Sequence, residues 1–121
     1  MFLPHISIGG NIMKWTIKKT QTLERKLENI LKEIPGVNLL SKSDNDPFNF
    51  AIVEFELAKK PYILQYDIID KNLELYAGNA EQDIPYAVIN HLIQKFPYAH
   101  FTQGKDSSQG HTWKHIEPSQ L

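Results

Sequence analysis

The chain has 121 residues, of which 41% are hydrophobic and 11% aromatic, so it can form one packed domain rather than a disordered chain. Its formal net charge of −1 argues against nucleic-acid binding through bulk electrostatics, and the absence of cysteine excludes disulfides, cysteine-based zinc sites and a cysteine nucleophile. No apolar run approaches the roughly 20 residues that span a bilayer, so we expect a cytoplasmic protein that binds neither membrane nor nucleic acid.

The first twelve residues differ from the rest of the chain. They contain no Lys, Arg, Asp or Glu and include Pro4 and the pair Gly9-Gly10. We expect residues 1–12 to be a peripheral leader, of native or artificial origin, residues 13–101 to form a single α+β domain, and residues 102–121 to be a polar tail. Within the domain, Trp15 and Ile17 alternate with polar neighbours from Met13 to Lys18, which is typical of a short strand.

The clearest helical pattern runs from Thr22 to Ile34. Its apolar residues recur at i, i+4, i+7, i+8 and i+11, which is one stripe of an amphipathic helix. Thr20 or Thr22 can cap its start, and Pro35-Gly36 is expected to end it. A second helix is predicted after Asp83, which we expect to cap it.

Between the helices, three strands are predicted at Phe48–Leu57, Tyr62–Ile69 and Leu73–Ala77, after a polar loop at Ser41–Pro47. Strands joined by short turns pair antiparallel. A short last strand is expected at residues 98–101. The fold class is therefore α+β, a two-layer sandwich in which two helices cover one face of an antiparallel sheet of 3–5 strands, in the order (β)-α-β-β-β-α-(β).

The sheet face without helices is the predicted functional surface. If Val53, Phe55 and their counterparts on the neighbouring strands point inward, the alternation of side chains directs the intervening residues outward. The candidate partner-binding residues on this face are Glu54, Glu56, Asp67, Glu74 and Tyr76. An acidic, partly apolar face suits a basic protein partner. The plain alternative is an ordinary solvated sheet face.

Metal binding is a weaker hypothesis. His111 and His115 are separated by four residues, a spacing that could place both on one metal if the segment were helical. Thr112 occupies the position at which a zinc-protease motif has Glu, and the flanking residues are typical of a loop. We therefore expect no metal and no cofactor, and an exposed tail at these histidines.

Two families resemble the predicted element order. The order helix, three strands, helix resembles double-stranded-RNA-binding domains, but the start of the second helix has no basic residue. With a further strand the order resembles the core of PD-(D/E)xK nucleases, in which Asp67 and Glu74 could supply the acids. Tyr76 then occupies the position of the lysine. The match is degenerate, and no family membership follows from it.

The leading hypothesis is a small non-catalytic protein-binding domain of the toxin-neutralising (immunity) or chaperone type, as found in bacteria. The alternative is a metal-dependent nuclease or hydrolase that uses Asp67, Glu74 and late histidines. A homodimer formed through an exposed edge strand is a further expectation.

Overall fold

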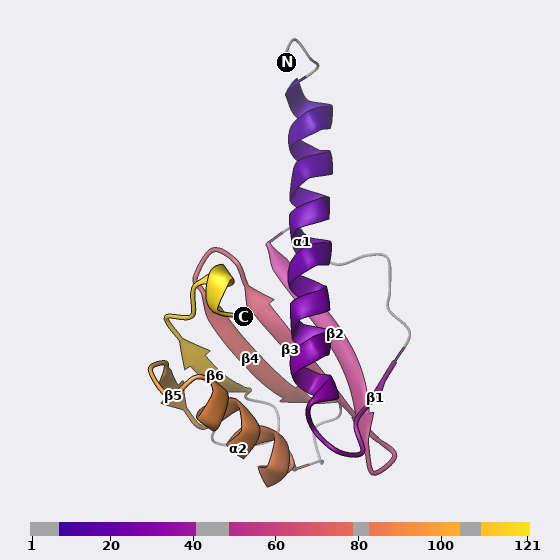
Figure 1. Ribbon diagram of the computed structural model, residues 1–121, viewed down its shortest axis with the longest axis vertical. Helices are drawn as coiled ribbons and strands as arrows, with labels where there is room; N and C mark the ends of the chain where they lie inside the picture. Colours follow the sequence, from indigo (N-terminus) through magenta and orange to yellow (C-terminus); the bar gives the residue numbers. More distant parts are fainter. Residues whose placement is uncertain (1–7, 41–48, 79–82, 105–109) are drawn as a thin grey trace.

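The computed structural model describes residues 8–40, 49–78, 83–104 and 110–121. Within these residues the chain forms helices α1 (Ile8–Lys32) and α2 (Tyr86–Lys95), a 3-10 helix η1 (Pro118–Gln120), and strands β1 (Asn38–Leu39), β2 (Phe50–Leu57), β3 (Lys60–Asp67), β4 (Asn72–Ala77), β5 (His100–Thr102) and β6 (His111–Lys114). The strands pair antiparallel in one open sheet, in the order β1-β2-β3-β4-β6-β5 (Figure 1). The α+β prediction is confirmed, but the sheet of the described residues has six strands rather than the predicted 3–5. Residues 1–7 of the expected leader and the loop at 41–47 lie outside the described residues.

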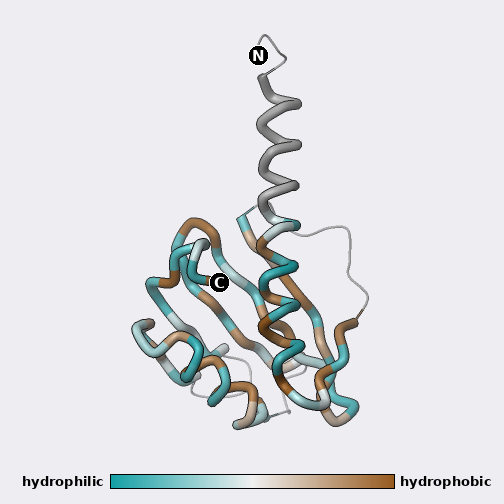
Figure 2. Tube along the Cα trace, viewed as in Figure 1, coloured by the Kyte–Doolittle hydropathy of each residue, from teal (hydrophilic) through white to brown (hydrophobic). Residues whose placement is uncertain are grey.

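One face of the sheet carries the hydrophobic core. Alternate side chains of β2, β3 and β4 are buried, and they form a single cluster with the apolar stripes of α1 and α2. The largest fully buried side chains are Trp113, Tyr66, Phe55 and Phe96. Brown apolar stretches alternate with teal polar ones along the strands and helices (Figure 2). The apolar stripes of both helices therefore join the core on one side of the sheet, which roughly matches the predicted two-layer arrangement.

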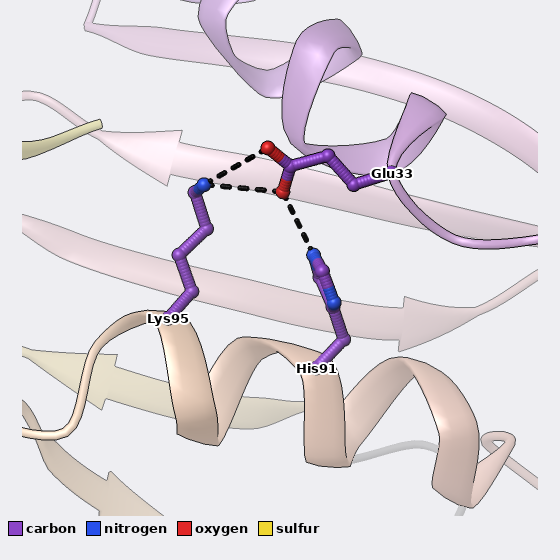
Figure 3. A network of polar contacts seen from close by, with 3 residues as sticks. All are labelled: Glu33, His91 and Lys95. Atoms are coloured by element: carbon purple, nitrogen blue, oxygen red, sulfur yellow. Dashed lines mark hydrogen bonds and ion pairs between the residues drawn. The ribbon is translucent and has the colours of Figure 1, made fainter.

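A polar network joins the end of α1 to α2 (Figure 3). Both carboxylate oxygens of Glu33 accept hydrogen bonds from Lys95 Nζ at 3.1 Å, and Glu33 Oε1 lies 2.9 Å from His91 Nε2. The hydrogen bonds from His91 and Lys95 lower the pKa of Glu33. Because the network is largely exposed, we interpret it as a modest link between the helices rather than a site for chemistry.

The predicted strand at Met13–Lys18 is wrong, because these residues lie within α1. The helix begins at Ile8, so Thr20 and Thr22 are interior positions and do not cap it, and part of the expected leader is helical. No proline or glycine interrupts the chain between Gly10 and the apolar stripe, and six alternating residues are compatible with a helix that continues through them. The helix therefore continues through these residues despite their alternating pattern.

The ends of the second helix and of the strand expected at residues 98–101 differ from the prediction. The N-cap of α2 is Pro85, without a side-chain hydrogen bond, so the expected cap at Asp83 is wrong. A proline fits this position because its fixed φ suits a helix start and it has no N–H to satisfy. The strand expected at residues 98–101 is β5, shifted by one or two residues.

Residues 110–121 of the expected polar tail are instead part of the fold. Strand β6 lies between β4 and β5, and it buries Trp113 on the helix side of the sheet. Ile116 is also fully buried; its carbonyl accepts a hydrogen bond from the Tyr66 hydroxyl, and its N–H donates to the Lys71 carbonyl at 3.0 Å. Burial, with the nearby Glu117 and Asp67 carboxylates, raises the pKa of Tyr66 to about 12.

The turn between β2 and β3 holds two residues in the left-handed region. Ala58 has φ 53° and Lys59 has φ 65°, and the flanking Leu57 and Lys60 pair directly. This geometry is a two-residue hairpin turn, at which Asn and Gly are the preferred residues. Non-glycine residues adopt this conformation only at a cost, so the turn is strained by its sequence.

Candidate functional site

The sheet face opposite the helices, here called the open face, carries the predicted partner-binding residues. The strand register places Glu54 opposite Ile63, Ile63 opposite Tyr76, and Gln65 opposite Glu74. Because directly paired residues project from the same face, the backbone brings the whole predicted set to the open face: Glu54, Glu56, Asp67, Glu74 and Tyr76. None of these five is buried in the core.

Apolar side chains lie among the carboxylates. Ile52 and Ile63 are half-buried on the open face, and Phe50 lies opposite Asp67 at one end of β2. Apolar residues occupy both alternating sets of positions in β2. The β2–β3 register is continuous from Phe50 to Leu57, so this pattern reflects partial burial of both faces of the strand. The open face therefore combines charge with apolar contact area.

Glu74 is the centre of a polar cluster on this face. Its Oε1 accepts a hydrogen bond from Gln65 Nε2 at 2.7 Å, and its Oε2 accepts a longer one from the Tyr76 hydroxyl at 3.4 Å. Burial, together with the adjacent Glu74 carboxylate, raises the pKa of Tyr76. The Tyr76 hydroxyl is therefore a neutral donor, and the ring and carboxylate are held side by side.

Asp67 also has a structural role that was not predicted from the sequence. Its Oδ1 accepts hydrogen bonds from the backbone N–H groups of Ile69, at 3.0 Å, and Asp70, at 3.1 Å. A carboxylate that caps the N–H groups following it forms an Asx-type turn, and this one closes the β3–β4 hairpin. The sequence signal for this turn was weak, because Ile68 and Ile69, rather than polar turn residues, directly follow Asp67.

The open face is not uniformly acidic, because it extends onto β6 and β5. Thr112 lies opposite Glu74, and Lys114 lies opposite His100 on the same face. Thr112 and Lys114 were predicted to lie in a tail, so no cation was predicted on this face. Carboxylates on β2, β3 and β4 are thus followed by a lysine toward the β5 edge.

The structure does not bring the predicted metal ligands together. His111 is buried on the helix side, where its Nδ1 accepts a hydrogen bond from the Gly104 N–H at 2.9 Å and burial lowers its pKa. His115 is exposed beyond the end of β6. Asp67 and Glu74 project from the opposite face to His111. Among the described residues, no three His, Cys, Asp or Glu side chains form a group that could hold a metal ion.

Comparison with known proteins found no matching family model, no matching curated sequence and no matching solved structure. In the described part of the chain, neither helix has the length and apolar character needed to cross a membrane. The chemistry of the open face is therefore the basis on which a function is argued.

Proposed function

We propose that this chain is a non-catalytic protein-binding domain that engages a basic protein partner through the open face. One observation supports the proposal most: a face that α1 and α2 leave uncovered holds four carboxylates on three adjacent strands. Backbone pairing fixes the positions of these strands, so the partner would meet a preorganised surface. The carboxylates are Glu54, Glu56, Asp67 and Glu74.

The two kinds of side chain on this face have separate tasks in the proposal. The carboxylates steer a basic partner toward the face and select its orientation, and the half-buried Ile52, Ile63 and Tyr76 supply the apolar contacts that hold it. Lys114 marks the end of the acidic area, so the partner's basic surface lies over β2, β3 and β4. Toxin-neutralising proteins and secretion chaperones are the classes in which we place such a domain, in the cytoplasm of a bacterium.

The metal-dependent hydrolase is the less favoured reading. It requires carboxylates and late histidines to converge, whereas His111 lies on the opposite side of the sheet from Asp67 and Glu74. Asp67 also uses one carboxylate oxygen to cap the β3–β4 hairpin.

The test compares two charge-matched double variants. E54K/E56K reverses charge on the open face, and D70K/D83K reverses it at two exposed loop positions; each raises the net charge from −1 by four units. Proteins captured from a lysate of the source organism are identified, purified and titrated calorimetrically against wild type and both variants.

We expect E54K/E56K to weaken the purified partner's binding by about tenfold or more, because attraction becomes repulsion at two positions. D70K/D83K should stay within about twofold of wild type, which would correspond to less than about 0.5 kcal/mol. Equal losses in both variants would show a net-charge effect only, and no loss in E54K/E56K would show that the open face is not the binding surface.

A further inference from the structure

The ring of Tyr76 lies against the backbone of Gly110. A Cβ atom built on Gly110 would lie 2.5 Å from Tyr76 Cε1, 2.7 Å from Cζ and 2.8 Å from Cδ1. These nearly equal distances place the Cβ position over the face of the ring, because an approach in the ring plane would leave the two neighbours of Cε1 much farther away. Any residue other than glycine at this position would therefore require the Tyr76 ring to move.

One ring face therefore packs against the backbone of Gly110. Gly110 precedes His111, which pairs with Leu75, so the missing Cβ of Gly110 would project on the same side as Tyr76. Tyr76 is only half-buried, so part of its side chain stays accessible beside the contact with Gly110. The ring is a flat aromatic platform that packs against Gly110 on the open face.

The Glu74 carboxylate lies at the edge of this platform. Its Oε2 is 3.4 Å from the Tyr76 hydroxyl and its Oε1 is 2.7 Å from Gln65 Nε2. A carboxylate has about four lone-pair sites, so these two hydrogen bonds leave acceptor capacity for a ligand. An aromatic face beside such a carboxylate matches a planar cation that can stack and donate two hydrogen bonds at once.

We infer that Tyr76 and Glu74 form a binding site for an arginine side chain of the partner. The inference rests on the proposed function and names the group that the open face recognises. A guanidinium is planar, weakly hydrated and able to donate a fork of hydrogen bonds, whereas a lysine ammonium is a compact, strongly hydrated charge. Lys114 does not occupy this site. It lies four residues along the extended chain from Gly110, which places the two backbones roughly 13 Å apart.

Capped tetra-arginine and tetra-lysine peptides of equal charge are the probes. Each is titrated into the isotopically labelled full chain at low ionic strength and followed by NMR. We expect the arginine peptide to bind about fivefold more tightly than the lysine peptide, the factor that a cation–π contact of about 1 kcal/mol gives. The largest shifts should fall on the Tyr76 ring and on the backbone amides of Glu74 and Gly110.

Three variants separate the ring from other contributions. Y76L should abolish the arginine preference, and Y76F, which keeps the aromatic face, should retain it. Y86L is the matched control, because Tyr86 is 75% exposed on α2 and should not contribute. If Y76L does not fold, the chemical-shift changes of the wild-type protein on adding the arginine peptide test the site. Changes centred away from Tyr76 overturn the inference.

Equal affinity for the two peptides, no binding of either, or a preference that survives Y76L would each overturn the arginine site. These outcomes are distinct from failure of the proposed function, which the E54K/E56K titration measures independently. A captured partner that needs Glu54 and Glu56 but shows no dependence on Tyr76 would leave the proposed function standing without the arginine site.

Discussion

Replacing Ile116 with alanine should destabilise the domain by about 3 kcal/mol. The side chain is fully buried, and the substitution removes three carbon atoms, which at about 0.8 kcal/mol each amounts to roughly 2.4 kcal/mol of lost transfer free energy. A residual cavity adds to this, within the 2–5 kcal/mol that buried Ile-to-Ala substitutions cost. The backbone of Ile116 stays anchored by Tyr66 and Lys71, so the surroundings cannot fully collapse into the space.

Urea unfolding followed by circular dichroism measures this effect. With a slope of about 2 kcal/mol/M, the unfolding midpoint should fall by about 1.5 M while the slope is unchanged. Ile69→Ala is the matched control, because it makes the same chemical change at a side chain that is 71% exposed, and it should cost less than about 0.5 kcal/mol. A loss for Ile116→Ala as small as that of the control would refute the docking of this segment, and would restore the interpretation of residues 102–121 as a tail.

Two further predictions concern the turn and the buried histidine. A58N/K59G should raise the free energy of unfolding by about 1 kcal/mol, because relief of left-handed strain at two residues exceeds the extra chain entropy of glycine; an unchanged or lower urea midpoint would contradict the turn geometry. Burial lowers the pKa of His111 from its ordinary 6.5, so its stabilising contribution is complete above pH 6.5 and is lost as the pH falls from there toward the folded-state pKa. His111→Gln should therefore show a smaller loss of unfolding free energy between pH 7 and pH 5 than wild type, and an identical pH profile would contradict the prediction.

The central hairpins and the residues on the open face could be predicted from the sequence. Side chains alternate between the two faces of a strand, so the direction of every residue follows once one buried residue is identified. Val53 and Phe55 are strongly apolar, so their parity fixed the direction of Glu54 and Glu56, and short turns fixed the pairing of the neighbouring strands. The amphipathic stripe of α1 was equally clear, because five apolar side chains fall on one side of a helix. Local pattern was sufficient wherever it was long and bounded by turns.

The C-terminal strand could not be predicted from local pattern, because β6 has only four residues and its partner β4 is distant in sequence. Trp113 and Ile116 were the available signals, since two large apolar side chains in a polar segment favour docking onto a core. Their placement depends on the Leu73–Trp113 pairing, which spans 40 residues of chain. The contact between Tyr76 and Gly110 could not be predicted either, because it also depends on the pairing of β4 with β6.

The position of β6 between β4 and β5 has a consequence for the order in which the sheet can assemble. Strand β5 precedes β6 in the chain but pairs only with β6 among the described strands, so it cannot join the sheet until residues 111–114 have been synthesised and have paired with β4. The hairpins of β2, β3 and β4 have local contacts and can form earlier. During translation the nascent chain would therefore expose the unpaired edge of β4, a template for wrong pairing, until its last strand arrives.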